Sequence, residues 1–407
     1  MNKLVILGGG TCGVMCASIL SQAKLNNLEI TIIDKQDKLL SKLEASGNGR
    51  CNVTNNKELK EFLTHIDNPK YFYPLLKNFG PAQIISYMNE LGVELKEEKN
   101  NKMFPVTNKS TTISEALKNT LNNVELMFHT KVNSIKYEDN QYILDTSNGI
   151  VTCDYLVLSF GGMTYSNFGS DKNNFRMLEA LDLKVEKLTP QECSIQVKEP
   201  LSNLMGISLV DTNIVLRDKD KIIDKLNGDI LFTHFGLSGP GILNTSFTIN
   251  KHHHENIFIS LQLLNKDYED CKQYIYQIIK DYPNKNMFNC LNQLPNRLLE
   301  YILDTLEIKD IKNTHLNKKQ INELIHQLSS FTLQFKSFFK PEMAFVTSGG
   351  LSLKELKPKT LESKKYPNLY FGGEMIDVCG QLGGYNITLA LSCGYNIAQD
   401  IINKLSD

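Results

Sequence analysis

The first 35 residues alternate short apolar runs with a glycine-rich turn. Lys3 to Leu7 and Leu28 to Ile33 are uninterrupted apolar runs of the length typical of buried β strands. Between them, Val14 to Gln22 carries apolar and small residues at helical spacing. The order strand, turn, helix, strand predicts a βαβ unit, and hence an α/β fold with a parallel sheet.

The next part of the chain alternates between polar and apolar stretches. Lys42 to Asn55 is polar and rich in glycine, which predicts a long functional loop. Tyr71 to Leu91 has helical periodicity, and Val124 to Thr152 alternates as expected for a small β meander. Asp154 to Phe160 is another apolar strand, and it ends at a pair of glycines.

The pattern changes near residue 190. Residues 193–250 are rich in predicted strands, and residues 265–330 show helical periodicity separated by Pro and Asn. After residue 344 the chain returns to short strands and glycine turns, and a helix is expected from about Gly384 to Lys404. We therefore expect a nucleotide-binding domain built from both chain ends, residues 1–190 and 336–407, with a β-rich insert at 191–262 and a helical subdomain at 263–335.

Composition narrows the class of protein. The 407 residues are 41% hydrophobic and 22% charged, as in globular proteins. The 44 basic and 45 acidic residues give a net charge of −1, which argues against nucleic acid as the principal partner. We find no signal peptide and no apolar stretch long enough to cross a membrane. Nine cysteines without a CxxC pair favour reduced thiols in a cytoplasmic protein with no structural metal site. Nothing in the sequence indicates an oligomeric state.

The first chemical signal is Gly8-x-Gly10-x-x-Gly13, which lies between the first strand and the first helix. The first glycine makes a tight turn, the second lets the backbone approach a pyrophosphate, and the third lets the helix pack on the strand. Asp34 follows Gly13 by 21 residues, where a carboxylate can bind a ribose diol. The alternative is a tight turn that binds no ligand.

The choice between NAD and FAD depends on the rest of the chain. A second motif of this kind is missing from the sequence, because Gly236 to Gly241 has the wrong spacing and contains proline. One such unit with a large insertion and a glycine-rich return fits an FAD enzyme better than a reductase with separate FAD and NAD domains. Gly383 and Gly384 precede the last helix, whose N-terminus would stabilise negative charge on a reduced flavin.

Five separated blocks carry a family resemblance. They are Ser46 to Asn55, Phe232 to Pro240, Val346 to Gly350, Thr360 to Lys364, and Gly372 to Asn386. In this order they resemble the signature blocks of the BaiN-like (YhiN) flavoprotein family, which includes aminoacetone oxidase. The resemblance covers essentially the whole chain. It implies a Rossmann-type domain with non-covalent FAD, a β-barrel-like insert and a small helical subdomain.

We combine the motif and the resemblance in one set of expected FAD-binding residues. The Ser46–Asn55 loop and the Gly384 segment are expected to lie against the cofactor, and Glu374 near its ribityl or pyrophosphate atoms. The complete set is Gly8, Gly10, Thr11, Cys12, Gly13, Asp34, Lys35, Lys42, Ser46, Gly47, Gly49, Arg50, Cys51, Asn52, Val132, Gly161, Gly162, Gly373, Glu374, Asp377, Gly384, Tyr385 and Asn386.

The expected activity is hydride transfer between a small-molecule substrate and flavin N5. NADH, NADPH or O₂ would recycle the flavin, which supplies the difficult chemistry. Family members differ in their reactions, so the resemblance predicts the cofactor better than the substrate. The alternatives are an FAD-dependent tRNA-modifying enzyme and a flavin-binding protein without turnover.

Individual side chains are less informative. Tyr165, His234 and Tyr385 are candidate acids or bases because each is titratable and lies in a block expected to face the site. Cys51 could be a redox partner of the flavin, but without a nearby second cysteine we favour a packing role. Arg50 could bind phosphate or a substrate carboxylate, or lie on the surface. The run His252 to His254 looks metal-binding, although consecutive residues cannot share one face, and we expect a solvated loop.

Overall fold

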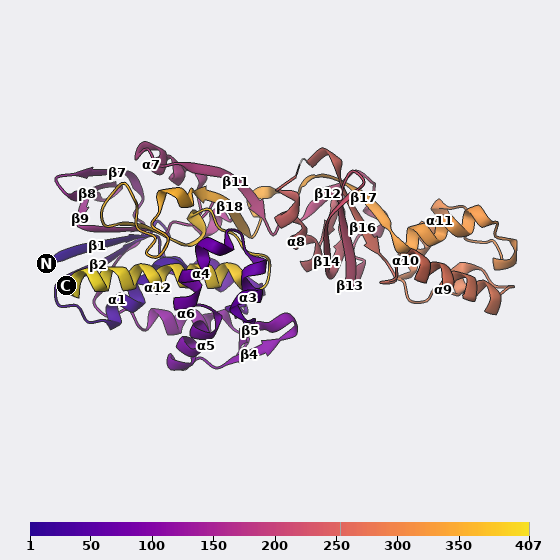
Figure 1. Cartoon of the computed structure of the whole chain (residues 1–407), viewed down its shortest axis with the longest axis horizontal. Coiled ribbons are helices and arrows are strands. Elements are labelled where there is room, and N and C mark those ends of the chain that lie inside the picture. The colour runs from indigo at the N-terminus through magenta and orange to yellow at the C-terminus, as the bar shows by residue number, and fades with distance from the viewer. Residues whose placement is uncertain (253, 407) are drawn as a thin grey trace. The chain divides into compact units, whose positions relative to one another are not determined.

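The computed structural model describes residues 1–252 and 254–406. Its internal contacts divide the chain into two units (Figure 1). The first unit contains Met1–Pro190 and Glu342–Asp407, and the second contains Gln191–Pro341. Each unit has its own hydrophobic core. Both chain ends therefore belong to the same unit.

A five-stranded sheet forms the centre of the first unit, and all its neighbouring strands are parallel. In order across the sheet the strands are β19 (Leu369–Phe371), β10 (Tyr155–Leu158), β1 (Asn2–Leu7), β2 (Leu28–Ile33) and β6 (Val124–Met127). The strand β19 comes from the far end of the chain and pairs with β10. The predicted α/β fold with a Rossmann-type sheet made from both ends is confirmed.

Two helices pack together beside this sheet. Helix α1 (Thr11–Gln22) follows the glycine turn, and α12 (Tyr385–Ser406) ends the described chain (Figure 1). The helices meet closely at Gly394, where an added Cβ would lie 2.4 Å from the carbonyl oxygen of Cys12. Only glycine allows this approach, so the first and last helices hold the chain ends together.

Several elements of the first unit differ from the sequence predictions. The expected long loop is partly the helix α2 (Ser41–Gly49). The single helix expected over 71–91 is two helices, α4 (Pro69–Asn78) and α5 (Pro81–Glu90), because the backbone becomes extended at Gly80. The expected meander is also divided: β6 joins the parallel sheet, and β7 (Val132–Glu138), β8 (Gln141–Thr146) and β9 (Gly149–Cys153) form a separate antiparallel sheet.

The remaining elements of this unit are short. Strands β3 (Thr54–Asn55), β5 (Lys102–Pro105) and β4 (Leu95–Glu98) form one sheet, and β11 (Val185–Gln191) pairs with β18 (Val346–Leu351). Helices α3 (Leu59–Phe62), α6 (Ser110–Lys118) and α7 (Phe175–Ala180) complete it. Strand β3 lies close to the start of α12 and therefore bears on the candidate site.

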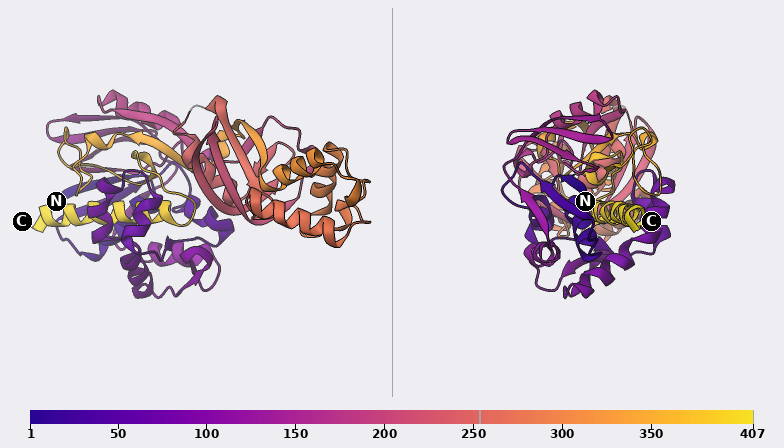
Figure 2. Two further views of the ribbon diagram at one scale, coloured as in Figure 1. Left: turned by 45° about the vertical axis from the view of Figure 1, so that its right-hand side comes forward. Right: turned by 90° about the vertical axis from the view of Figure 1, so that its left-hand side faces the viewer.

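The described residues of the second unit form a closed six-stranded barrel that carries additional helices (Figure 2). The strands in order are β12 (Ile195–Val197), β15 (Gly236–Ser238), β14 (Lys221–Phe232), β13 (Ser208–Asp218), β16 (Ile257–Gln262) and β17 (Phe331–Phe338). Helix α8 (Pro240–Ile249) interrupts the region expected to be rich in strands. Helices α9 (Tyr268–Asp281), α10 (Asn296–Thr305) and α11 (Lys318–Ser329) lie at one end of the barrel. Strand β17 continues through residue 335, where we expected the helical subdomain to end. The expected division of the chain into four parts stays a prediction.

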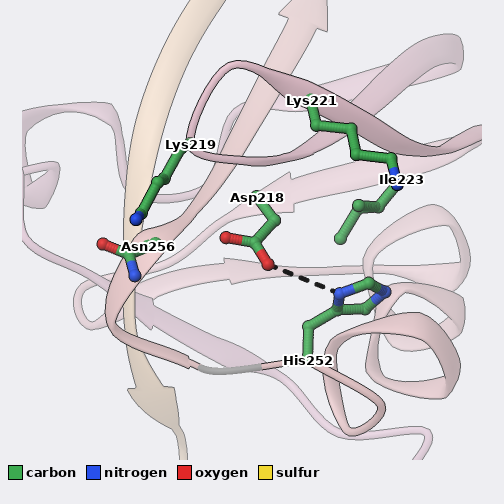
Figure 3. Close-up of a pocket in the computed structure, with 6 residues that line it drawn as sticks. All are labelled: Asp218, Lys219, Lys221, Ile223, His252 and Asn256. Carbon is green, nitrogen blue, oxygen red and sulfur yellow. Dashed lines mark ion pairs between the residues drawn. The ribbon is translucent and has the colours of Figure 1, made fainter.

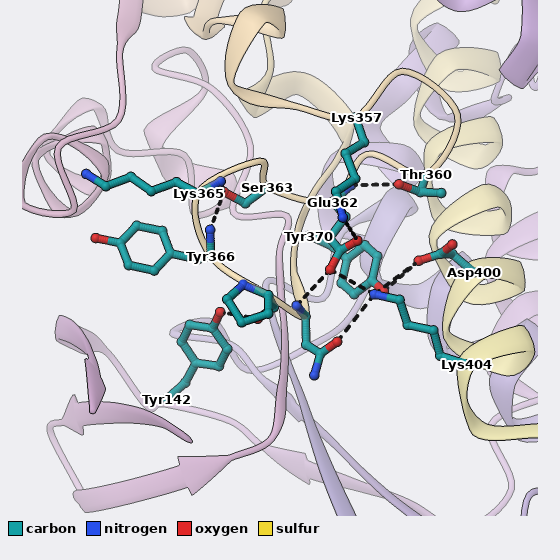
Figure 4. Close-up of polar contacts among 12 residues, drawn as sticks. Tyr142, Lys357, Thr360, Glu362, Ser363, Lys365, Tyr366, Tyr370, Asp400 and Lys404 are labelled. Carbon is teal, nitrogen blue, oxygen red and sulfur yellow. Dashed lines mark hydrogen bonds and ion pairs between the residues drawn. The ribbon is translucent and has the colours of Figure 1, made fainter. Parts of the chain in front are cut away.

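The buried carboxylate of Glu362 joins the segment that precedes β19 to helix α12. The side chain of Glu362 is only 5% exposed, and its two oxygens accept hydrogen bonds from Lys357 Nζ at 2.7 Å and Lys404 Nζ at 2.8 Å (Figure 4). Its Oε1 also accepts the backbone N–H of Asn368 at 2.9 Å. Burial alone would raise the pKa of Glu362, but the two lysines hold it below its ordinary value.

Within the residues that the structure describes, we find no helix with the length and apolar character needed to span a bilayer.

Candidate cofactor site

Two of the three motif glycines are required by packing within the protein. Gly8 has a φ of +110°, and an added Cβ would lie 2.5 Å from the carbonyl oxygen of Ser159. At Gly13 an added Cβ would lie 2.1 Å from the carbonyl oxygen of Gly8. These contacts place β1, β10 and α1 in close packing, as the motif predicts.

Packing does not account for the middle glycine. Gly10 has an ordinary φ of −79°, and an added Cβ would meet no described atom within 4 Å. A glycine that the protein itself does not need is expected where a pyrophosphate approaches the backbone. The first backbone bond of α1 runs from Val14 N–H to Gly10 O, so the preceding N–H groups have no helical partner and suit an anion. The turn therefore fits the expected FAD.

Asp34 holds the glycine turn as well as lying at the end of β2. Its Oδ2 accepts the N–H of Gly9 at 2.6 Å, and its Oδ1 accepts the N–H of Gln36 at 2.8 Å. A carboxylate has further lone pairs, so Asp34 can still accept from a ribose hydroxyl. The carbonyl oxygen of Asp34 accepts the N–H of Thr130, which brings the buried Val132 segment close. Lys35 lies 3.9 Å from Asp171.

The end of α2 leaves helical geometry at Ser46. Gly47, Asn48 and Gly49 follow with left-handed φ values of 57°, 56° and 78°. An added Cβ at Gly49 would meet no described atom within 4 Å, as at Gly10. Asn52 then anchors the segment, because its Oδ1 accepts the N–H of Met103 at 3.1 Å. The segment has the open backbone expected of a ligand-binding loop.

Arg50 and Cys51 are already engaged by the protein. The Arg50 guanidinium lies 4.1 Å from the ring centre of Phe104, pairs with Glu98, and donates to Asn108 Oδ1 at 2.9 Å. Burial raises the pKa of the Cys51 thiol to about 12, so it carries almost no thiolate at neutral pH. This supports the packing role that we favoured for Cys51.

Glu374 joins three parts of the first unit. Its Oε2 accepts from Lys42 Nζ of α2 at 2.5 Å, and its Oε1 accepts the backbone N–H of Thr347 in β18 at 2.9 Å. Thr164 lies 3.4 Å from the same Oε1. Gly162 is needed beside this carboxylate, since an added Cβ would lie 2.2 Å from Thr347 Oγ1. Lys42 and Glu374 are thus brought together as a polar pair.

The glycine after β19 packs against α1, and the glycine after β10 has a left-handed backbone. Gly373 has a φ of +75°, and an added Cβ would lie 3.0 Å from Cys12 Cβ. Gly161 also adopts a positive φ, of +78°. Cys12 is fully buried, and burial raises its pKa well above the ordinary thiol value. Asp377 is half-buried, and burial, followed by the charges of Glu186 and Asp67, raises its pKa.

The start of α12 lies against strand β3. Gly384 has a φ of +92°, and an added Cβ would lie 2.6 Å from Thr54 O. The Asn386 side chain holds the preceding turn by exchanging two hydrogen bonds with the Gly380 backbone, at 2.8 and 2.9 Å. Asn55, which our set of expected residues omits, donates its Nδ2 to Gly383 O at 3.0 Å. Its place at the end of the Ser46–Asn55 block was the only available signal.

The three candidate acids and bases have different surroundings. Tyr385 is 3% exposed and stacks on His65 with ring centres 4.9 Å apart, and burial raises its pKa, so it packs rather than titrates. Tyr165 has a φ of +57°, an unusual value for a side chain of this size, and lies 5.6 Å from the Phe345 ring. His234 belongs to the second unit, where its ring meets Phe235 at 5.0 Å.

A separate pocket of about 390 Å³ lies on the second unit (Figure 3). Two of its lining residues form an ion pair, with His252 Nδ1 3.5 Å from Asp218 Oδ2. The other lining residues are Lys219, Lys221, Ile223 and Asn256, none of which we expected to bind FAD. His253 lies outside the described residues. His252 faces a carboxylate, and the residues that the structure describes contain no group of three or more His, Cys, Asp or Glu that could hold a metal ion.

The first unit therefore brings together several of the expected cofactor residues from distant parts of the chain. The glycine turn meets Gly373, the adjacent Glu374 meets Lys42 of α2, and strand β3 meets the start of α12. These contacts form a continuous series from the N-terminus of α1 to the N-terminus of α12. Such a series fits an elongated dinucleotide whose pyrophosphate lies at the glycine turn.

Comparison with known proteins agrees with this geometry. Residues 2–400 match the family described as HI0933-like protein Rossmann domain. The chain is 29% identical to a ribosomal RNA dihydrouridine synthase of Escherichia coli (strain K12), covering 98% of this chain and 97% of the relative. It is 23% identical to a 3-dehydro-bile acid delta(4,6)-reductase of Clostridium scindens, and the match covers 97% of this chain and 98% of the relative.

The fold also resembles a solved structure. It matches 3-ketosteroid delta1-dehydrogenase from Sterolibacterium denitrificans with a TM-score of 0.53 and 11% identity, covering 99% of this chain and 100% of that one. At this identity the likeness concerns the fold alone. Together, the glycine turn, the sheet built from both chain ends and the family match over residues 2–400 show that the chain belongs to the HI0933-like Rossmann family of flavoproteins and is an FAD-dependent oxidoreductase.

Proposed function

We propose that this protein reduces a carbon–carbon double bond conjugated to a carbonyl group. The observation that carries the proposal is a chemical feature shared by two relatives that match almost the full chain. Making dihydrouridine saturates the C5=C6 bond of uracil, which is conjugated to the C4 carbonyl. A delta(4,6)-reductase of a 3-dehydro bile acid acts on double bonds conjugated to the C3 carbonyl. The substrates differ, but the reacting group is the same.

This reaction needs a hydride at the β-carbon and a proton at the α-carbon. When bound, FAD supplies the hydride after it has been reduced by NADH or NADPH. The residues of this chain would bind and orient the cofactor. The N–H groups around Gly10 would hold the pyrophosphate, and Glu374, oriented by Lys42, would contact the ribityl chain. The buried Cys51 thiol takes no part, because its raised pKa keeps it protonated.

The N-terminus of α12 contributes electrostatics. This helix has 22 residues and begins after two glycines with positive φ. A helix N-terminus stabilises nearby negative charge by about 0.3–1 kcal/mol, and up to about 2 kcal/mol when partly buried. Placed at the pyrimidine ring of FAD, it would favour the reduced, anionic cofactor over the oxidised one.

Two substrate classes meet this description, and each is favoured by one observation. The 29% identity to the E. coli relative favours a uracil base in ribosomal RNA. The net charge of −1, without the basic excess typical of RNA-binding proteins, favours a small conjugated ketone. The expectation that nucleic acid is not a partner stays a prediction.

An anaerobic half-reaction separates these classes. FAD-loaded protein is reduced with NADPH or NADH and then mixed with ribosomal RNA, free uridine, or a 3-oxo-delta4 steroid. The proposal predicts that one of them reoxidises the flavin and gains two hydrogen atoms, as measured by mass spectrometry. Reoxidation by O₂ alone, with every conjugated substrate returned unchanged, would overturn the proposed reaction but leave the FAD assignment intact.

A further inference from the structure

A buried asparagine lies between β3 and the start of α12. Asn55 is 1% exposed, and its Nδ2 donates to two backbone carbonyls, Asn100 O at 3.1 Å and Gly383 O at 3.0 Å. Both partners of this nitrogen are acceptors, so the orientation of the amide is fixed. A flipped amide would place its oxygen against two carbonyl oxygens.

The oxygen of the same amide lacks a hydrogen-bond donor in the described residues. Asn55 Oδ1 is buried and has no hydrogen-bond partner among the residues that the structure describes. Buried acceptors without a donor are uncommon and costly, and each calls for an explanation. An N–H or O–H from outside the chain is therefore expected at this atom.

This acceptor lies beside the N-terminus of α12. Its amide binds the carbonyl of Gly383, and Thr54, the preceding residue, is in contact with Gly384 at the start of α12. Helix α12 begins there, at Tyr385, and a helix N-terminus is the positive end of the helix dipole, which attracts acceptor groups of a ligand. A ligand that fits must offer one donor with acceptors beside it.

The pyrimidine edge of the FAD isoalloxazine has this pattern. Its N3–H lies between two carbonyl groups, at C2 and C4. The adenine end of the molecule belongs with the ribose beside Asp34, at the other end of the series of contacts. We propose that Asn55 Oδ1 accepts the N3–H of the FAD isoalloxazine and so selects and positions the flavin ring at the start of α12.

The analogue 3-methyl-FAD tests this assignment, because it replaces the N3–H with a methyl group. The apoprotein is titrated with FAD and with 3-methyl-FAD, and flavin fluorescence gives the two dissociation constants. We expect wild-type protein to bind the analogue about tenfold more weakly, or worse. We expect Asn55→Ala to weaken FAD binding and to remove the discrimination between the two flavins.

Asn56→Ala is the matched control, since Asn56 is exposed and its Nδ2 donates to Glu97 Oε2 at 2.7 Å. This variant should discriminate as wild type does. Equal binding of both flavins by wild-type protein would overturn the proposal. Discrimination that persists in Asn55→Ala would also overturn it, because the N3–H would then have another acceptor.

Loss of the Asn55 bond to Gly383 could loosen α12, so a second measurement uses unaltered protein. FAD labelled with ¹⁵N at N3 is bound to wild type, and exchange of the N3–H with solvent is followed by NMR. Slow exchange, with the shift of a hydrogen-bonded imide, is expected. An N3–H that exchanges as in free FAD would contradict the assignment, whatever happens to the variant.

Discussion

Lys42 and Glu374 form an ion pair across 332 positions of sequence, with Nζ 2.5 Å from Oε2. Lys42 lies in α2 near the N-terminus, and Glu374 follows the last strand of the sheet. The second carboxylate oxygen of Glu374 accepts the backbone N–H of Thr347. The pair therefore joins the two chain ends at the place where the ribityl chain of FAD is expected.

Replacement of Lys42 by methionine should weaken FAD binding about tenfold, because Glu374 loses the cation that orients it. Fluorescence titration of the apoprotein measures the dissociation constant. Lys38→Met is a suitable control, since Lys38 is 56% exposed and pairs with Glu44 instead. Unchanged FAD affinity in Lys42→Met would show that the pair is only structural.

Gly10→Val should abolish FAD retention without destabilising the apoprotein. The added side chain meets no described atom at its Cβ, and the backbone φ of −79° is ordinary, so only the ligand is displaced. Thermal unfolding of the apoprotein and the flavin content after gel filtration test the two parts separately.

Gly13→Ala is the comparison variant for Gly10→Val. Its added Cβ would lie 2.1 Å from Gly8 O, so the backbone of the apoprotein would have to move to accommodate it. We expect a lower melting temperature for that variant even without FAD. Full flavin occupancy in Gly10→Val would contradict the role assigned to the turn.

The native protein should expose about one thiol to a thiol-reactive dye at mildly alkaline pH. Eight of the nine cysteines are buried, and Cys290 is partly exposed. Burial holds the pKa of Cys51 at about 12, so few thiolates form there. Cys51→Ala should keep its flavin and its reduction by NADPH, and rapid labelling of Cys51 in native protein would contradict this account.

Glu362→Gln should lower the free energy of unfolding by about 2 kcal/mol, since the buried carboxylate loses two charged partners, Lys357 and Lys404. The pKa of Glu362 is lower in the folded protein than its ordinary value. Its contribution to stability is therefore complete above the ordinary glutamate pKa of about 4.3 and is lost as the pH falls through the lowered value. Urea unfolding at neutral and acidic pH should show the wild type and the variant converging in acid.

The sequence predicted the parts of the fold that depend on local pattern. The structure contains the predicted βαβ unit, with strands at Lys3 to Leu7 and Leu28 to Ile33 on either side of the glycine turn and its helix. This unit was predictable because short apolar runs and the glycine spacing determine it locally. The final helix was also expected, within two residues at its C-terminal end.

The errors have nonlocal causes. Val124–Met127 leaves the meander because β2 offers an unpaired parallel edge, which the alternation of side chains does not reveal. Ser41–Gly49 becomes helical although its composition suggests a loop. Arg50 could not be placed from sequence, since Phe104 and Glu98 approach it from a separate hairpin. The unpartnered oxygen of Asn55 likewise emerges only when α12 folds back on β3.

The most direct test of the central claim is flavin binding by the purified chain. Apoprotein is mixed with FAD, passed over gel filtration, and its visible spectrum recorded against its protein concentration. The glycine turn and the start of α12 predict one bound FAD for each chain, with flavin bands that bleach on anaerobic reduction. Colourless protein that leaves the column without flavin would contradict the account.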